Sequence, residues 1–328
     1  SLASPGRDIN FDIGRIKGYR NFCNKIWNAF RFIEMQVTNH DYKSGDGSSD
    51  ILSDWMGSKI HQASENCQAH IKNYRFDLAS AEIYELVWSN FCDWYIEFSK
   101  VAIQKSEKKD KTNNLISNLI TNFYSILELL HPFMPFITEE LSSKLALLVK
   151  KEKSGFLVQS GFAHARTSNE KTEKQVDEII NIVSALRVIR AENLNIQNET
   201  LHLILSTDMS LEMQSVVAGQ KDIIAGIAKL DGIKFTDEIP KESIEKTMGG
   251  YKIIIPLEGL IDPKEELTRL QKELTDVEND IKIINSKLAN KKFVAKAPPA
   301  VVEKEKAKIE EAENKKGMLE KSITKLRS

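Results

Sequence analysis

The stretch GYRNFCNKIWNAFRFI, residues 18–33, decides the first element of the fold. Its apolar side chains recur mostly every three or four residues, so they lie on one face of a predicted helix. They are Tyr19, Phe22, Cys23, Ile26, Phe30 and Ile33. A helix with so broad an apolar face must bury it against neighbours, and the stretch therefore predicts a helix bundle.

The segments that follow this stretch supply the neighbouring helices. A second helix is predicted from Ser53 to about Tyr74, and a third begins near Asp77. A polar connector over 105–114 precedes a fourth helix over 115–130. The motif HPFMPF then ends that helix at its first proline and can open another at its second. This part of the chain is predicted to form an antiparallel helix bundle.

The middle of the chain, residues 152–261, is predicted to be a small α/β domain. Its expected elements are a helix over 170–191, strands over 201–205 (LHLIL), 233–235 and 251–257 (YKIIIPL), and a helix over 209–230. The strands are recognised by alternation or by a β-branched run after two glycines.

The last part, residues 262–328, carries a heptad pattern with apolar positions spaced alternately by three and four. The first seam consists of Leu267, Leu270, Leu274, Val277, Ile281, Ile284 and Leu288. The second consists of Val302, Ile309, Ala312, Leu319, Ile323 and Leu326, interrupted by Glu305 and Lys316. Two such seams predict a C-terminal antiparallel coiled-coil hairpin, with helices of about 26 residues that are roughly 40 Å long.

The connection NKKFVAKAPPAVVEKEKAK, residues 290–308, would form the tip of this hairpin. It places Phe293 and Val294 among the cations Lys287, Lys291, Lys292 and Lys296. Lysines bind phosphates and apolar side chains contact exposed base planes, so the tip suits a folded nucleic acid. Alternatively, the two apolar residues cap the open end of the coiled coil and the lysines are solvated; both interpretations can hold together.

A second polar feature lies on the first helix, opposite its apolar face. It consists of Asn21, Lys25, Asn28 and Phe32, and Arg31 flanks it. Amides read base edges, cations hold phosphates and an aromatic ring stacks a base, so this stripe suits single-stranded nucleic acid. The alternative is that Phe32 makes a second packing contact and the polar residues are merely solvated.

Composition excludes several classes of protein. The 41% hydrophobic and 28% charged residues are typical of a soluble globular chain, and no apolar run is long enough for a transmembrane helix. The N-terminal segment is not a signal peptide, and the absence of an initiator methionine suggests an excised fragment. Three widely spaced cysteines favour a reducing, cytoplasmic environment.

Charge points to nucleic acid only locally, because the net charge is −1. Residues 7–31 hold six cations against two carboxylates, a local balance of +4. Residues 287–308 hold seven lysines against two glutamates, a local balance of +5. Charge runs are also typical of solvated helix faces, so the patches do not decide the function alone.

No catalytic pattern and no metal-binding pattern emerges from the sequence. The six histidines are scattered, and motifs for phosphate loops, nucleophile elbows and zinc sites are missing. We therefore expect neither a catalytic residue nor a metal ligand in this chain.

Four motifs, in order, resemble the C-terminal region of bacterial-type valyl-tRNA synthetases. They are GYRNFCNKIWNAFRF, RFDLASAEIYELVWSNFCDWY, HPFMPFITEEL and NKKFVAKAPPAVVEKE. The opening SLASPGRDINFD is similar to the segment that follows the nucleotide-binding core in that family. Isoleucyl, leucyl and methionyl enzymes share variants of the bundle motifs, whereas a terminal hairpin with FVAKAP at its turn favours the valyl type.

The resemblance implies a helical anticodon-binding domain over 1–151, a connecting domain over 152–261 and a tRNA-binding arm over 262–328. In the first domain, the residues expected to face the anticodon loop are Arg15, Asn21, Lys25, Asn28, Arg31 and Phe32. The arm is expected to pack on the outer corner of a valine-specific tRNA through its tip.

The resemblance also implies what this chain lacks. The HIGH and KMSKS motifs that bind ATP in the family are absent, so the chain alone is expected to be inactive. ATP and magnesium would then be bound by the missing catalytic core of the same enzyme. We expect a cytoplasmic monomer without membrane contact. Two alternatives stay open: the equivalent fragment of another class I synthetase, or a coiled-coil module that binds another protein.

Overall fold

The computed structural model describes residues 13–43, 48–150, 155–161, 168–193, 196–258 and 263–289, and short helical pieces at 308–309, 312–317, 319–320 and 323–324. Contacts divide the chain into two compact units. The first comprises Ser1–Asn181 with Gly219–Ile227, and the second comprises Ile182–Ala218 with Ala228–Ser328. The domain boundaries predicted after residues 151 and 261 stay predictions.

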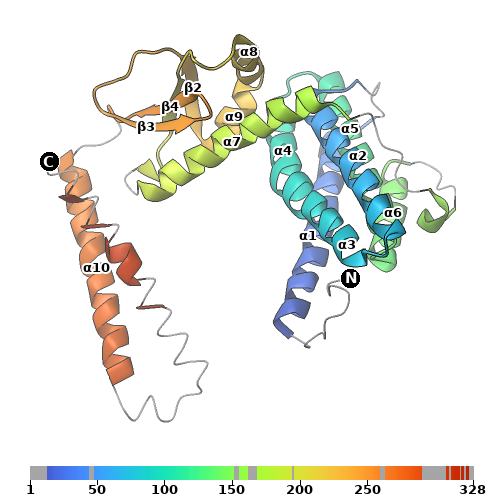
Figure 1. The fold of residues 1–328 in the computed structure, drawn as a ribbon, viewed down its shortest axis with the longest axis horizontal. Helices are drawn as coiled ribbons and strands as arrows, with labels where there is room; N and C mark the ends of the chain where they lie inside the picture. Colours follow the sequence, from blue (N-terminus) through green and yellow to red (C-terminus); the bar gives the residue numbers. More distant parts are fainter. Residues whose placement is uncertain are drawn as a thin grey trace. The chain divides into compact units, whose positions relative to one another are not determined.

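The first unit is a helix bundle, whose helices α1 to α6 lie alongside one another in Figure 1. Its elements are α1 (Ile13–Asn39), α2 (Ile51–Lys72), α3 (Phe76–Glu85), the π-helix η1 (Leu86–Tyr95), α4 (Ile96–Gln104), α5 (Lys109–Leu130), α6 (Pro135–Leu148), the 3-10 helix η2 (Leu157–Gln159), the first half of α7 (Glu170–Glu192) and most of α9 (Lys221–Ala228). α1 packs against α5, α6 and η1, and α2 packs against α3, α5 and η1. The predicted bundle is confirmed.

The core of the bundle is built from large aromatic and branched side chains. Phe30 and Ile33 on α1 are buried, as the apolar face of the opening stretch predicted. The ring of Phe123 on α5 contacts both Phe30 and Phe91, at centroid distances of 6.4 and 5.7 Å. Burial of such side chains is the main source of stability in a bundle, so α1 is held firmly along its apolar side.

Local signals set the ends of two helices. Asp50 caps α2, because its carboxylate accepts hydrogen bonds from the backbone N–H groups of Leu52 and Ser53. Pro135 stands in the first turn of α6, where its missing N–H costs nothing. The HPFMPF motif therefore acts as predicted.

The predicted polar connector before α5 is wrong in its second half, because α5 begins at Lys109 and not at residue 115. The first turns of this helix bury Thr112 and Asn113 in the bundle. Asn113 Oδ1 accepts from the backbone N–H of Lys43, and Thr112 Oγ1 donates to the carbonyl of Lys108. A prediction based on hydrophobicity assigns such polar residues to a loop, because it does not detect that they are buried with hydrogen-bond partners.

The π-helix η1 continues the rod of α3 into α4 without a break. In a π-helix the backbone N–H groups bond to carbonyls five residues earlier; here the N–H of Ile96 bonds to Phe91. The sequence predicted an ordinary helix across this segment. π-helical turns are rare and are found often at functional sites. Trp88 and Asp93 of η1 contact Lys25 of α1.

The second unit contains a four-stranded mixed sheet in the order β2-β1-β4-β3. Its strands are β1 (Leu201–Leu205), β2 (Leu230–Phe235), β3 (Ser243–Met248) and β4 (Tyr251–Pro256). β1 pairs in parallel with β2, while β4 pairs in antiparallel fashion with β1 and β3. The buried residues of β1 and β4 confirm the small α/β fold, with these two strands at the centre.

Three details of this region differ from the prediction. The helix expected over 209–230 is two helices, α8 (Leu211–Gly219) and α9, and β2 begins three residues early. β3 was not predicted, because it is an edge strand whose side chains are exposed or only half-buried. It joins β4 through Gly249 and Gly250, whose φ angles of 48° and 130° suit glycine in a tight turn. The helix predicted over 170–191 is confirmed as α7 (Glu170–Glu192).

Candidate nucleic-acid interface

The candidate interface is the solvent-exposed face of α1, here called the α1 face. It consists of six exposed residues, and successive members are one, three or four positions apart: Lys17, Arg20, Asn21, Asn24, Asn28 and Arg31. At 3.6 residues per turn they fall within an arc of roughly 100°, over a length of about 21 Å. Three cations and three amides on one face offer charge for phosphates, and both donors and acceptors for base edges.

Half of the α1 face was not predicted from the sequence. Lys17, Arg20 and Asn24 make no side-chain hydrogen bond or ion pair with any residue that the structure describes, so they are available to a ligand. They lie on the side of the predicted stripe that faces away from η1. The same spacing of three and four residues could have found them, had the flank of the stripe been included.

Three predicted residues lie on the α1 face. Asn21 and Asn28 are exposed, and so is Arg31, whose Nε lies 3.3 Å from Glu34 Oε2. Exposed ion pairs of this kind contribute at most about 1 kcal/mol, so the Arg31 guanidinium can exchange its partner for a phosphate. The backbone of Arg15 lies in α1, but its side chain is outside the described residues.

Lys25 is already engaged inside the bundle. Its Nζ donates to Asp93 Oδ1 at 2.6 Å and lies 3.7 Å from the centroid of the Trp88 ring. Both partners belong to η1, and the Lys25 side chain is only 23% exposed. The structure therefore separates Lys25 from the exposed cations of the α1 face.

Phe32 is half-buried at the edge of α1. The Nζ of Lys100 on α4 lies 5.6 Å from the centroid of its ring, within the range of a cation–π contact. The same ammonium donates to Glu97 Oε1 at 2.6 Å. The ring thus has a packing contact within the bundle while part of it stays exposed.

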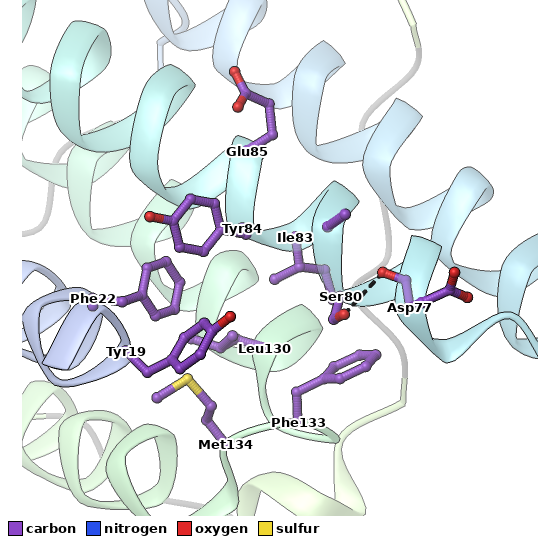
Figure 2. Close-up of a pocket in the computed structure, with 12 residues that line it drawn as sticks. Tyr19, Phe22, Asp77, Ser80, Ile83, Tyr84, Glu85, Leu130, Phe133 and Met134 are labelled. Atoms are coloured by element: carbon purple, nitrogen blue, oxygen red, sulfur yellow. Dashed lines mark hydrogen bonds between the residues drawn. The ribbon is translucent and has the colours of Figure 1, made fainter. Parts of the chain in front are cut away.

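A cavity of about 770 Å³ opens beside the first turns of α1 (Figure 2). Aromatic side chains line it, together with the carboxylates of Asp77 and Glu85. Arg75 holds Asp77 through two hydrogen bonds of 2.9 and 2.7 Å, which lower the pKa of that carboxyl to about 2. No lysine or arginine is among the described lining residues, so the cavity does not attract phosphate and is not part of the interface.

The described residues show no metal-binding cluster, and two of their cysteines have raised pKa values. No group of three or more His, Cys, Asp or Glu side chains within them is arranged to hold a metal ion. Burial raises the pKa of Cys67 to about 11 and that of Cys92 to about 12, so both thiols stay protonated and unreactive at neutral pH. Among the described helices, none has the length and apolar character needed to cross a bilayer.

Residues from both predicted helices of the coiled-coil hairpin are within the described part of the chain. α10 (Pro263–Ala289) carries the first seam, and pieces of the second seam pack against it. The contact consists of Val277, Leu319 and Ile323, with Leu274, Ile281 and Ala312 packed around them. All six are heptad positions of the predicted seams, which confirms their pairing. The tip residues Lys291, Lys292, Phe293 and Lys296, and the side chain of Lys287, lie outside the described residues.

An ion pair fixes the register of the two seams. Lys316, which interrupts the second seam, donates from Nζ to Glu278 Oε1 at 2.8 Å and lies 3.8 Å from Glu320 Oε1. Its hydrogen bond to Glu278 lowers the pKa of that carboxyl, so the pair stabilises the hairpin above the usual pKa of glutamate and is lost as the pH falls through the lowered value. A polar residue at a seam position is a common way to specify register.

Reversing one charge of this pair is expected to loosen the hairpin. Glu278→Lys places two cations together, so backbone amides in 271–289 should exchange hydrogen faster, as measured by mass spectrometry. Adding Lys316→Glu should restore most of the protection, although the new carboxylate faces Glu320. Glu313→Lys, at an exposed position, is the control. Equal effects of Glu278→Lys and the control would contradict the assigned register.

Two family models each match a different part of the chain. Residues 53–205, which begin within α2, match a family model described as the anticodon-binding domain of tRNA ligase. Residues 262–327, which include α10, match a model described as the valyl tRNA synthetase tRNA binding arm.

Curated relatives extend the likeness along nearly the whole chain. It is 36% identical over 312 residues to the valine–tRNA ligase of Francisella tularensis subsp. tularensis. It is 35% identical over 317 residues to that of Acinetobacter baylyi, and 33% over 329 residues to that of Psychrobacter arcticus. These matches cover 94 to 95% of this chain but 32 to 34% of the relatives, so the chain spans about a third of their length.

The two family models and the relatives lead to the same conclusion. Since the chain is 33 to 36% identical to valine–tRNA ligases along 94 to 95% of its length, it belongs to the valyl-tRNA synthetase family and carries its anticodon-binding and arm regions.

Proposed function

We propose that this chain recognises tRNA on behalf of a valyl-tRNA synthetase. The helix bundle would bind the anticodon loop through the α1 face, and the hairpin would bind the outer corner of the tRNA. The observation that supports this most directly is the α1 face, with three cations and three amides exposed on a helix that packs against α5, α6 and η1. Those three elements lie within residues 53–205, which match an anticodon-binding model, whereas α1 precedes the matched residues. Single-stranded loops are where proteins read RNA sequence most often.

The proposed mechanism is positioning. Phosphate contacts hold and orient an RNA, while contacts to base edges supply sequence discrimination. The cations of the α1 face and the arm would supply the phosphate contacts. The amides Asn21, Asn24 and Asn28 would supply the contacts to base edges. Binding energy gained far from the reacting end would then orient the acceptor end of the tRNA at a catalytic site.

The rest of the reaction would take place outside this chain. We propose that ATP, magnesium and valine are bound by a catalytic core that corresponds to the two thirds of the relatives without a counterpart here. On this proposal the chain alone does not charge tRNA, its partners are a valine tRNA and that core, and it works as a monomer in the cytoplasm. A protein-binding hairpin stays as the competing function, and the match to the arm model favours tRNA.

Titration by fluorescence anisotropy tests the proposal. The ligands are a valine tRNA, an isoleucine tRNA and a valine transcript with an altered anticodon, each at several salt concentrations. Salt-dependent binding that favours the intact valine anticodon is expected. A chain that binds none of the three at low salt would overturn the proposed function, and equal binding of all three would remove the anticodon from it.

Removing a cation of the α1 face is expected to weaken tRNA binding about tenfold at low salt, as is typical of a lost charge-assisted contact. Arg20→Ala and Arg31→Ala should each also reduce the slope of log K against log salt concentration by roughly 0.7 to 0.9, because one phosphate contact is lost. Lys111→Ala, an exposed cation on α5, is the control and should leave the slope unchanged. Unchanged slopes for both arginine variants would show that the α1 face does not bind phosphate.

A further inference from the structure

We propose that Lys25 is a positioning residue, which ties α1 to η1 and so fixes the rotation at which α1 presents its exposed face to RNA. The inference deepens the proposed function and rests on it. It assigns Lys25 a role different from that of the six residues of the α1 face, although all seven are on the same helix.

The contacts of Lys25 leave little for an RNA ligand. Its ammonium donates to Asp93 Oδ1 at 2.6 Å and lies over the Trp88 ring at 3.7 Å. A phosphate could reach the ammonium only by displacing the carboxylate or the ring. In contrast, Lys17 and Arg20 have no ion pair within the described residues and are exposed.

The π-helical geometry of η1 explains how one ammonium can meet both partners. Trp88 and Asp93 are five residues apart on the same helix. In an α-helix, residues five apart point about 140° away from each other. In a π-helix the backbone hydrogen bonds join residues five apart, which brings their side chains to nearly the same side. An α-helix over this segment would turn one of the two partners away from Lys25.

The ring that Lys25 covers belongs to a stack that ties α1 to α3 and η1. Trp88 stacks on Tyr84 at 5.6 Å between centroids and 8° between planes. Tyr84 stacks in turn on Phe22 of α1 at 4.8 Å and 20°; Figure 2 shows these two rings beside each other. Lys25 and Phe22 are three residues apart on α1, so the cation and the stack grip one side of the helix together.

These contacts also set the direction of the neighbouring α1 face, because Lys25 lies four residues after Asn21 and three before Asn28. Each residue of an α-helix turns by about 100°, and the α1 face is itself only about 100° wide. Rotation of α1 by a fraction of a turn would therefore exchange which amides and cations point to an RNA. Contacts that set this angle act on discrimination between RNA ligands, because base readout needs correct alignment.

Substitution of the two partners distinguishes positioning from contact. Lys25→Met keeps a long side chain over Trp88 but removes the charge, and Asp93→Asn removes the acceptor charge without changing the shape. If Lys25 positions α1, both variants should reduce the preference for the intact valine anticodon by about tenfold. Both should leave the salt slope unchanged, and Lys25→Arg should restore the preference. Lys17→Met, as a matched change on the α1 face, should instead lower the slope by roughly 0.7 to 0.9.

Asp93→Asn gives the sharpest contrast, because the variant removes a negative charge from an RNA-binding surface. A protein in which Lys25 contacts phosphate should bind RNA more tightly when Asp93 no longer competes for it. A tighter complex for Asp93→Asn, with a lower slope for Lys25→Met, would overturn the inference. Circular dichroism of each variant checks that the bundle is still folded.

A measurement without RNA keeps this inference separate from the proposed function. Hydrogen exchange of α1 amides should be faster in Lys25→Met and Asp93→Asn than in the unmodified chain, and Lys17→Met should not change it. Unchanged exchange in both would overturn positioning by Lys25 even if the chain binds tRNA well. Faster exchange in a chain that binds no tRNA would instead overturn the proposed function and leave the structural tie intact.

Discussion

Replacing Arg190 by methionine is expected to destabilise the second unit by about 3 kcal/mol, because this guanidinium satisfies five backbone carbonyls. Its Nη1 donates to the carbonyls of Ile196, Gln197 and Glu199 at 2.8, 3.4 and 2.7 Å. Its Nη2 donates to those of Ala228 and Lys229 at 2.9 and 3.0 Å. Each buried polar group left without a partner costs about 1 to 3 kcal/mol, and several of these carbonyls can turn to water instead.

The position of Arg190 explains why its loss reaches the sheet. The side chain leaves the last turns of α7 and holds the segment that leads into β1 to the segment that leads into β2. Burial lowers the pKa of Arg190, opposed by the charge of Glu199, but an arginine stays protonated at neutral pH. Lysine cannot replace the fork of five donors, so Arg190→Lys should recover only part of the loss.

Hydrogen exchange of peptides from β1 and β2 measures this effect in the second unit. The four tryptophans, Trp27, Trp55, Trp88 and Trp94, all belong to the first unit, so fluorescence does not report on the sheet. Glu192→Met, two residues later on α7 and exposed, is the control and should change stability by less than about 0.5 kcal/mol. Unchanged protection of both strands in Arg190→Met would contradict the role given to this side chain.

The parts of the fold that the sequence predicted are those with a strong local pattern. The apolar face of α1, the two seams of the hairpin and strand β1 have the repeat that a buried face requires, and β4 is a β-branched run after two glycines. The start of α5 was misplaced because Thr112 and Asn113 are polar and buried. β3 was missed because an edge strand needs no continuous apolar face.

The candidate site was predicted in part, for a related reason. Periodicity places Asn21, Asn28 and Arg31 on a polar face but does not say which residues a neighbouring helix covers. The ammonium of Lys25 is taken by Trp88 and Asp93, a tertiary contact that depends on the π-helical turn. No local propensity distinguishes a π-helix from an α-helix in this sequence, so the engagement of Lys25 could not be foreseen.

The other large effect is expected at Trp55, whose replacement by alanine should destabilise the bundle by about 3 to 5 kcal/mol, the usual cost of removing a buried aromatic side chain. Trp55 is fully buried, and its ring meets Phe98 edge-on at 6.4 Å between centroids and 82° between planes. Its Nε1 donates to Asp177 Oδ1 at 2.9 Å, which joins α2 to the first half of α7. The cavity that alanine leaves would therefore open beside a polar contact.

Two further variants separate the packing of Trp55 from its hydrogen bond. Trp55→Phe keeps most of the buried ring but loses the donor, and it should cost about 1 to 2 kcal/mol. Asp177 keeps a partner in that variant, because Lys59 Nζ lies 3.0 Å from its Oδ2. Urea unfolding followed by fluorescence of the remaining tryptophans measures both changes. Trp27→Ala, at a position that is 37% exposed, is the matched control. Because a partly exposed ring has smaller transfer and cavity costs than a fully buried one, Trp27→Ala should cost less than Trp55→Ala. An equal loss at the two positions would show that burial does not set the cost, and that Trp55 is not the anchor of α2 in the bundle.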